Sequence, residues 1–141
     1  MEVNINLWAV IVAAIASMAV GFVWYGVLFK KSWMQLMGIT AESMKGVKMT
    51  ANKAYLIQFI ASLVMAYSFQ RILYNLQGFP TVDISNGGIF GITFLIWLGF
   101  VAPITLGVVL WEGKSWKLWF INASNYLVAL IVMGVILALW Q

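Results

Sequence analysis

The chain has 141 residues, 64% of them hydrophobic, and its mean hydropathy of +0.98 lies far above the range of soluble domains. It contains no Cys and no His, which excludes disulfides, thiolate nucleophiles, imidazole acid–base catalysis and the usual zinc and haem ligands. The net charge is +4, and none of the four carboxylates lies near the middle of an apolar stretch. Paired-carboxylate catalysis and a proton-coupling carboxylate in mid-membrane are therefore unsupported. We expect no catalytic residue, no metal site and no cofactor, and we do not favour an enzymatic activity.

Four apolar stretches make up most of the chain, and each is long enough to cross a membrane as a helix. A helix rises about 1.5 Å per residue, so about 20 residues cross a hydrocarbon core of about 30 Å. The stretches are residues 7–29, 54–76, 89–110 and 118–140. They predict one all-α domain, residues 1–141, built as an integral membrane bundle of four transmembrane helices. Because no basic residue precedes the first stretch, we expect a retained helix there and no cleaved signal peptide.

The lysines lie in the two connections on one side of this predicted bundle. They are Lys30, Lys31, Lys45, Lys48 and Lys53 in the first connection, and Lys114 and Lys117 in the third. The second connection, 77–88, has neither Lys nor Arg and contains Asp83. The positive-inside rule then predicts an inner (plasma) membrane protein with cytoplasmic lysine loops and with both termini outside. The basic charge thus indicates orientation, and we expect no nucleic-acid partner.

The first connection is the one sizeable loop, and its pattern predicts two short helices. Gly38 suits the C-cap of the first, and Thr40 suits the N-cap of a second that runs to about Met49. Apolar faces beside lysines predict an in-plane amphipathic segment attracted to the anionic headgroups of the lipid bilayer. The residues we expect at the membrane surface are Lys30, Lys31, Lys45 and Lys48. A connector that merely rests on the surface is an equally good interpretation.

Small residues and one proline mark two of the predicted helices. The first stretch has a face of small residues at every fourth position: Ala9, Ala13, Ser17 and Gly21. Such a face lets another helix approach closely, either within the chain or in a dimer. In the third stretch Pro103 lacks a backbone donor and crowds the carbonyl of Gly99, which predicts a hinge or a packing kink at these two residues.

Polar residues gather in the half of the bundle nearest the lysine loops. The candidate ligand-binding residues there are Tyr25, Gln58, Thr105, Glu112, Asn122, Asn125 and Tyr126. Two asparagines in one hydrophobic helix require hydrogen-bond partners. We interpret this cluster either as a ligand or conduction site or as interhelical hydrogen bonds worth less than about 2 kcal/mol per pair. Nearly all the tryptophans, by contrast, lie near a predicted membrane boundary and are explained by aromatic belts.

Several sequence runs resemble a known family. The runs are Trp24-Tyr25, Phe29-Lys30-Lys31-Ser32-Trp33-Met34, Leu36-Met37-Gly38-Ile39-Thr40, Leu98-Gly99-Phe100-Val101-Ala102-Pro103, Glu112-Gly113-Lys114, Ile121-Asn122-Ala123, and Met133-Gly134 with the closing Leu139-Trp140. Together they are similar to the domain of unknown function 1761 family of small bacterial four-helix inner-membrane proteins. The resemblance covers nearly the whole chain. It implies a single four-helix membrane domain and supplies no activity, so the function is argued from the residues.

These observations lead to one functional hypothesis and one alternative. The leading hypothesis is a small polytopic protein that binds or passes a small neutral or polar molecule from the cytoplasmic side. Because four helices enclose little volume, we expect it to act as a homo-oligomer. The alternative is a non-catalytic accessory or assembly subunit of a larger membrane complex. Small multidrug transporters, which use a glutamate embedded in their first helix, are rejected because the first stretch has none.

Overall fold

The structure is a computed structural model that describes residues 4–85 and 87–141. Four of its helical units are long and apolar enough to cross a membrane, which confirms the all-α prediction of four spans. The first span is α1 (Leu7–Val23) with the π-helical turn η1 (Trp24–Leu28), and the second is α4 (Ala51–Gln77). The third span runs through α5 (Gly88–Ile96), the π-helical turn η2 (Trp97–Val101), α6 (Ala102–Thr105) and α7 (Gly107–Leu110), and the fourth is α8 (Trp116–Leu139).

Polar N-caps determine where three of the spans begin. The Asn6 side chain accepts hydrogen bonds from the first amides of α1, and the Ser115 hydroxyl accepts one from Leu118 N at the start of α8. The Thr50 hydroxyl caps α4 in the same way. The second span therefore begins at Ala51 and not at the predicted residue 54, because its N-cap, Thr50, precedes the apolar stretch.

Two short helices, α2 (Lys30–Met37) and α3 (Ala41–Lys45), connect the first two spans. Gly38 has a φ of 70° and ends α2, as predicted, since glycine adopts this left-handed conformation without steric cost. Thr40 begins α3 and exchanges hydrogen bonds with Ser43 in a capping box. The prediction that this helix runs to about Met49 is wrong, because it ends at Lys45 beside a glycine, a residue that weakens helices.

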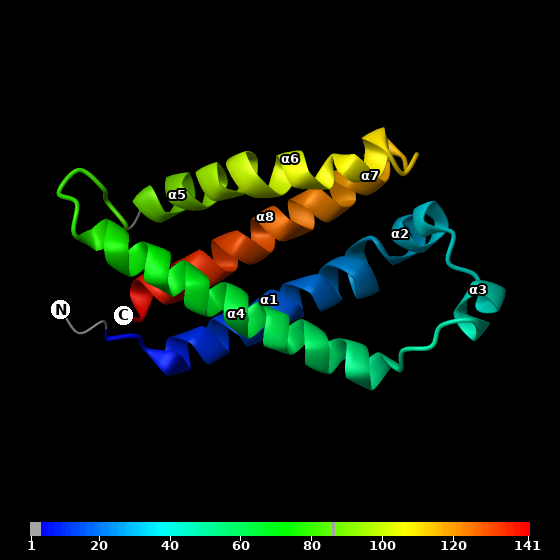
Figure 1. The fold of residues 1–141 in the computed structure, drawn as a ribbon, viewed down its shortest axis with the longest axis horizontal. Helices are drawn as coiled ribbons and strands as arrows, with labels where there is room; N and C mark the ends of the chain where they lie inside the picture. The colour runs from blue at the N-terminus through cyan, green and yellow to red at the C-terminus, as the bar shows by residue number, and fades with distance from the viewer. Residues whose placement is uncertain (1–3, 86) are drawn as a thin grey trace.

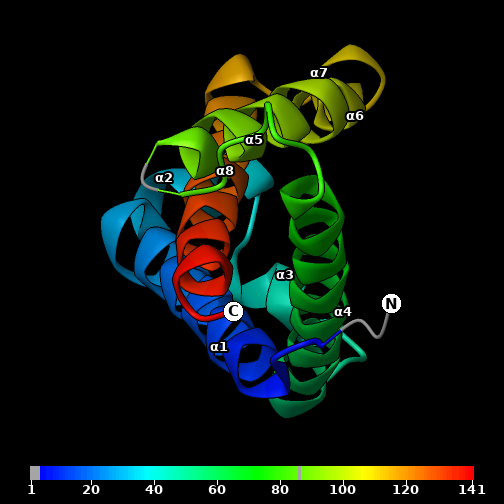
Figure 2. The same cartoon turned by 90° about the vertical axis from the view of Figure 1, so that its left-hand side faces the viewer.

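Helix α8 is the centre of the bundle and the most buried of the four spans. Figures 1 and 2 show it between α1 and α5, and it contacts α1, α4, α5 and η2. Helix α4 crosses α1 and diverges from α8 toward the end that carries α2 and α3 (Figure 1). Because of this divergence, the first part of α4, residues 51–58, is exposed on every side.

The hydrophobic core lies in the half of the bundle that is nearer the termini. Met133 and Leu137 of α8 are fully buried there against Phe69 and Leu73 of α4. Three of the four small residues of α1 are buried, namely Ala9, Ala13 and Ser17, whereas Gly21 is half-buried. Ala9 and Ala13 belong to the same core cluster as these residues of α4 and α8.

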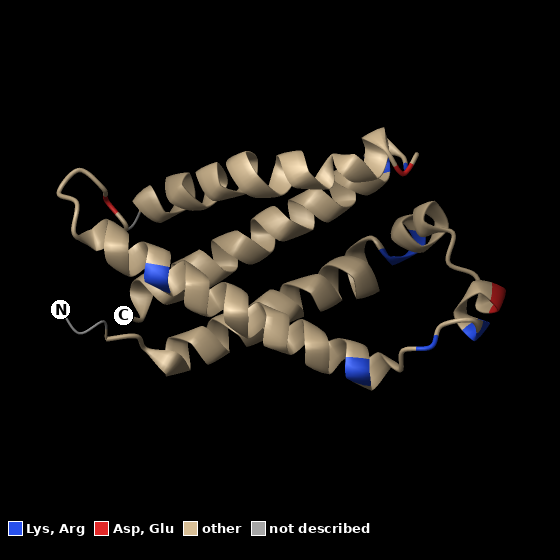
Figure 3. Ribbon diagram, viewed as in Figure 1, with Lys and Arg blue, Asp and Glu red and all other residues tan. Residues whose placement is uncertain are grey.

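Charged residues divide the bundle into two ends. Figure 3 shows the lysine-containing connections together at one end and the two termini at the other. We call these the lysine end and the terminal end. The lysine end carries α2, α3 and the turn between α7 and α8, while the terminal end carries residues 4–6, Gln141 and the connection from α4 to α5.

Candidate functional site

The polar residues of α8 lie in its lysine-end half and face the first span. The Tyr25 hydroxyl donates a hydrogen bond to Asn122 Oδ1 at 3.0 Å. The ring of Tyr25 packs against Trp33 of α2, with 5.0 Å between the ring centroids. Helix α2 thus folds back onto the lysine end of the bundle and covers the pair formed by Tyr25 and Asn122.

Two tryptophans fix the backbone of α8 on either side of Asn122. The Trp24 indole Nε1 donates to the carbonyl of Ile121 at 2.8 Å, and the Trp97 indole Nε1 donates to the carbonyl of Ala123 at 2.7 Å. Each tryptophan is the first residue of a π-helical turn, η1 for Trp24 and η2 for Trp97. Such turns are rare and occur often at functional sites. Two of them therefore frame the same polar segment of α8 from two different spans.

Asn125, one turn further along α8, is 6% exposed, and its side-chain Oδ1 has no hydrogen-bond partner. Its polar neighbours are arranged differently. The Ser124 hydroxyl donates back to the carbonyl of Phe120 in its own helix, and Tyr126 is exposed on the bundle surface. Asn125 is consequently the polar residue of this segment that is both buried and incompletely bonded.

The other three predicted ligand-binding residues are not part of this arrangement. The Thr105 hydroxyl donates to the carbonyl of Val101 at 2.9 Å and accepts from the Trp119 indole at 3.1 Å, so it joins the third span to α8. Gln58 is exposed on the part of α4 that diverges from α8, and Glu112 is exposed in the turn after α7. The structure thus brings together Tyr25, Asn122 and Asn125 and separates Gln58 and Glu112 from them.

The predicted hinge residues lie in and beside η2. Gly99 is inside this π-helical turn, and the turn ends where Ala102 N bonds to the carbonyl of Trp97, directly before Pro103. In the π-helical turn η2 the backbone hydrogen bonds are shifted by one residue relative to an α-helix. Pro103 follows this shift, so the fold accommodates both its missing N–H donor and its ring. The backbone irregularity predicted from Pro103 is therefore present as a π-turn, and both residues are exposed on the bundle surface.

Charged groups stay at the periphery of the site. The predicted membrane-surface residues Lys30, Lys31, Lys45 and Lys48 are all exposed at the lysine end. Among residues 4–85 and 87–141, no three His, Cys, Asp or Glu side chains come close enough together to hold a metal ion. The chemistry that the cluster itself offers is neutral hydrogen bonding, from one phenol and two carboxamides.

Comparison with known proteins identifies the family of the chain. Residues 8–138 match the model of a family described as protein of unknown function, DUF1761. The chain belongs to this family. The match covers nearly the whole chain and confirms the resemblance stated above. No curated protein and no solved structure gives a significant match.

In this DUF1761 chain, sequence reasoning missed the two indole hydrogen bonds to α8. Trp24 was assigned to an aromatic belt because it lies near a predicted membrane boundary. Trp97 is different, since it lies well inside the third span, far from either boundary. A buried indole N–H usually finds a partner, so a tryptophan inside a span is the signal that points to such a bond. The partner itself was not predictable, because it is a backbone carbonyl of another helix.

Proposed function

We propose that this protein binds a small neutral molecule with hydrogen-bonding groups at the polar cluster of α8, and passes or holds it within the membrane. The single observation that carries the proposal is the buried, unpartnered Oδ1 of Asn125. An acceptor left unsatisfied in a dry interior costs about 1–3 kcal/mol. A ligand that donates a hydrogen bond to Oδ1 removes this cost, and the neutral lining favours an uncharged ligand.

The geometry around Asn125 supports a binding site over polar residues that only hold the helices together by hydrogen bonds. If the polar residues served only to hold helices together, each would be expected to end in a bonded pair, as Tyr25 and Asn122 do. The Asn125 side chain also bonds to Tyr25, but its Oδ1 has no partner, although Trp24 and Trp97 hold the adjacent backbone in place. Rigid supports around an unsatisfied group are typical of preorganised binding sites.

We propose that the ligand reaches this cluster from the cytoplasm of a cell whose inner membrane holds the protein. The support is the charge distribution: the lysine-containing connections lie together at one end of the bundle, opposite the termini (Figure 3). Lysines in short connections mark the cytoplasmic side, where they meet anionic headgroups. The Tyr25 and Asn122 pair lies under α2 at this same end.

Self-association is the second element of the proposal. Gln58 is exposed on a part of α4 that no other helix covers, and a carboxamide facing lipid is costly without a partner. A second copy of the chain supplies one. The same exposed face equally suits docking onto a different membrane protein, so it is also consistent with the alternative of a non-catalytic accessory subunit.

The experiment measures solute flux into vesicles that contain the purified protein. Stopped-flow light scattering follows swelling in urea, acetamide and glycerol, for wild type, Asn125→Leu and Asn52→Leu. Asn52 is an exposed carboxamide at the start of α4, so its variant controls for the same chemical change. We expect wild type and Asn52→Leu to swell faster than protein-free vesicles in at least one solute and Asn125→Leu to fall to the protein-free rate.

Two results oppose the proposal. Equal swelling of wild-type and protein-free vesicles in all three solutes contradicts passage, and an unchanged rate in a folded Asn125→Leu variant contradicts the assigned site. Co-purification of a fixed partner protein in constant stoichiometry, together with either result, supports the accessory-subunit alternative.

A further inference from the structure

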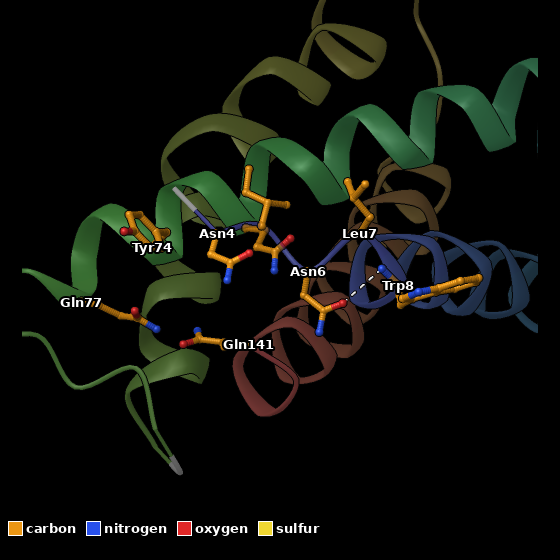
Figure 4. Close-up of a pocket in the computed structure, with 9 residues that line it drawn as sticks. Asn4, Asn6, Leu7, Trp8, Tyr74, Gln77 and Gln141 are labelled. Atoms are coloured by element: carbon orange, nitrogen blue, oxygen red, sulfur yellow. Dashed lines mark hydrogen bonds between the residues drawn. The ribbon is translucent and has the colours of Figure 1, made fainter. Parts of the chain in front are cut away.

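A pocket of about 580 Å³ lies at the terminal end, opposite the polar cluster of α8. It forms where the first residues of α1, the last turns of α4 and the residue after Trp140 meet (Figure 4). The lining residues are Asn4, Ile5, Asn6, Leu7, Trp8, Gln70, Tyr74, Gln77 and Gln141. We call this cavity the amide pocket, because carboxamides dominate its polar lining. Its size is within the range of sites for small molecules.

The chemistry of the lining selects for uncharged, hydroxyl-rich groups. Five carboxamides and one phenol line the amide pocket, and no charged side chain does. Each carboxamide offers two donors and an acceptor, so together they match a ligand with several hydroxyl groups, each of which both donates and accepts. An ion gains no opposite side-chain charge here to offset any hydration that it loses.

Gln70 gives this pocket an unsatisfied group of its own. It lies on the buried face of α4 and is 5% exposed, and its side-chain Oε1 has no hydrogen-bond partner. A buried acceptor in this state costs about 1–3 kcal/mol, and a hydroxyl that donates to it removes the cost. The residue therefore points to a ligand independently of the shape of the cavity.

One wall of the amide pocket is fixed while other amides remain available. Asn6 Oδ1 accepts from Trp8 N at 3.1 Å and from Ala9 N at 3.2 Å, and Asn6 Nδ2 donates to the carbonyl of Trp140 at 3.3 Å. This side chain thus fastens the start of α1 to the end of α8. Within residues 4–85 and 87–141, the side chains of Asn4, Gln77 and Gln141 make no hydrogen bond, and Figure 4 shows them facing a common space.

We propose that the amide pocket binds an uncharged polyhydroxylated group of monosaccharide or disaccharide size. The group is either a free sugar or the sugar headgroup of a glycolipid, because the pocket lies where the first, second and fourth spans meet at their terminal ends. This site is separate from the polar cluster of α8, so it goes beyond the function proposed above and does not depend on it.

The test consists of two measurements on the protein in nanodiscs. Binding of radiolabelled glucose and maltose is measured in nanodiscs of phosphatidylcholine. Retention of monoglucosyl-diacylglycerol is measured by native mass spectrometry in nanodiscs that contain this glycolipid. The variants are Gln70→Leu, which removes the unsatisfied acceptor, and Asn75→Leu, an exposed amide of α4 outside the pocket. We expect saturable binding of a free sugar or retention of the glycolipid. Gln70→Leu weakens it about tenfold or more, the effect of losing one hydrogen bond of about 1.4 kcal/mol, while Asn75→Leu does not.

The stability of Gln70→Leu and the binding of a charged sugar serve as further controls. Gln70→Leu is expected to be as stable as wild type, because the change removes a buried unsatisfied atom, so lost binding is not a folding defect. Glucuronate, a charged sugar of the same size, is expected to bind at least tenfold more weakly than glucose. Free-sugar binding identifies a solute and glycolipid retention alone identifies a headgroup, and both support the site.

Three outcomes overturn this proposal. They are no saturable binding of either sugar form, equal binding of glucuronate, and unchanged binding by Gln70→Leu. Asn125→Leu separates this site from the proposed function, since it is expected to leave sugar binding intact. A fourth result, sugar binding that disappears in Asn125→Leu, would contradict a separate pocket at the terminal end.

Discussion

The two halves of α8 differ in how completely they are packed and bonded. In the terminal half, Met133, Gly134 and Leu137 are buried in an apolar core formed with α4 and α5. In the lysine-end half, Asn122 and Asn125 replace such residues, and one of them keeps a free acceptor. One helix thus combines a half whose buried residues are well packed with a half in which one buried acceptor has no hydrogen-bond partner. Violations of this kind are expected at functional sites, so within α8 the terminal half is assigned to stability and the lysine-end half to ligand binding.

The largest effect on stability is expected from Gly134→Val, which overfills the terminal half. A Cβ at Gly134 would lie 3.0 Å from Thr93 Oγ1 and 3.1 Å from Phe69 Cε1, so these two side chains must give way to admit even a Cβ. We expect the free energy of unfolding in mixed micelles to fall by about 1–3 kcal/mol or more. The measurement is an SDS-titrated unfolding curve followed by circular dichroism.

The control for this change is Gly91→Val in α5, where a Cβ meets nothing within 4 Å. It makes the same substitution in the neighbouring span, at an exposed position. An equal loss of stability in both variants would show that glycine itself, and not the packing of the terminal half, is responsible.

A smaller effect is expected from Trp97→Phe and from Trp24→Phe, which act on the lysine-end half. Each change removes one indole N–H that bonds to an α8 carbonyl, and a hydrogen bond of this kind contributes about 0.5–1.5 kcal/mol. The same unfolding curves measure the loss. Trp111→Phe is the matched control, since Trp111 is 87% exposed at the lysine end. A loss as large for Trp111→Phe would contradict the assigned role of the two indoles.

The smallest effect is expected at Asp83, in the connection that joins the terminal ends of α4 and α5. Its carboxylate accepts hydrogen bonds from Ser85 Oγ at 2.7 Å and from Ser85 N at 2.8 Å, which lower the pKa of Asp83. A pKa that is lower in the folded state stabilises the fold above the unfolded pKa of about 3.9, and this contribution is lost as the pH falls through the folded pKa. The midpoint temperature of thermal unfolding is therefore expected to fall slightly more in acid for wild type than for Asp83→Asn. Parallel pH profiles of the two proteins would contradict this assignment.

The sequence predicts the fold better than the site, for physical reasons. Span lengths and caps are local properties, so the four spans, the Gly38 cap and the Thr40 cap were predictable. The π-helical turns were not, because a shift of one hydrogen bond has no fixed residue pattern, although Pro103 indicated an irregular third span. Gln58 shows the limit of periodicity. It shares a helical face with Ser62 and Gln70, which are buried, but it lies in the part of α4 that diverges from α8 and is therefore exposed.

The amide pocket lay outside the sequence prediction for a related reason. Its amides come from positions far apart in the chain, such as Asn4, Gln70 and Gln141, and only the folded termini bring them together. By contrast, Tyr25, Asn122 and Asn125 were predictable as a group, because spans of known direction place them at the same depth. Depth in the membrane follows from sequence position, whereas the direction in which a helix leans does not.

The central claim is that Asn125 is a binding residue and not a structural one, and its direct test is the unfolding free energy of Asn125→Leu. Replacing a buried acceptor that has no partner by an apolar side chain of similar shape is neutral or stabilising. Because Asn125→Leu removes only the bond between this side chain and Tyr25, we predict that its free energy of unfolding in SDS lies at most about 0.5–1.5 kcal/mol below that of wild type. A loss clearly larger than the about 0.5–1.5 kcal/mol expected for the bond between Tyr25 and the Asn125 side chain would show that Oδ1 is also bonded within the fold, and would contradict the claim.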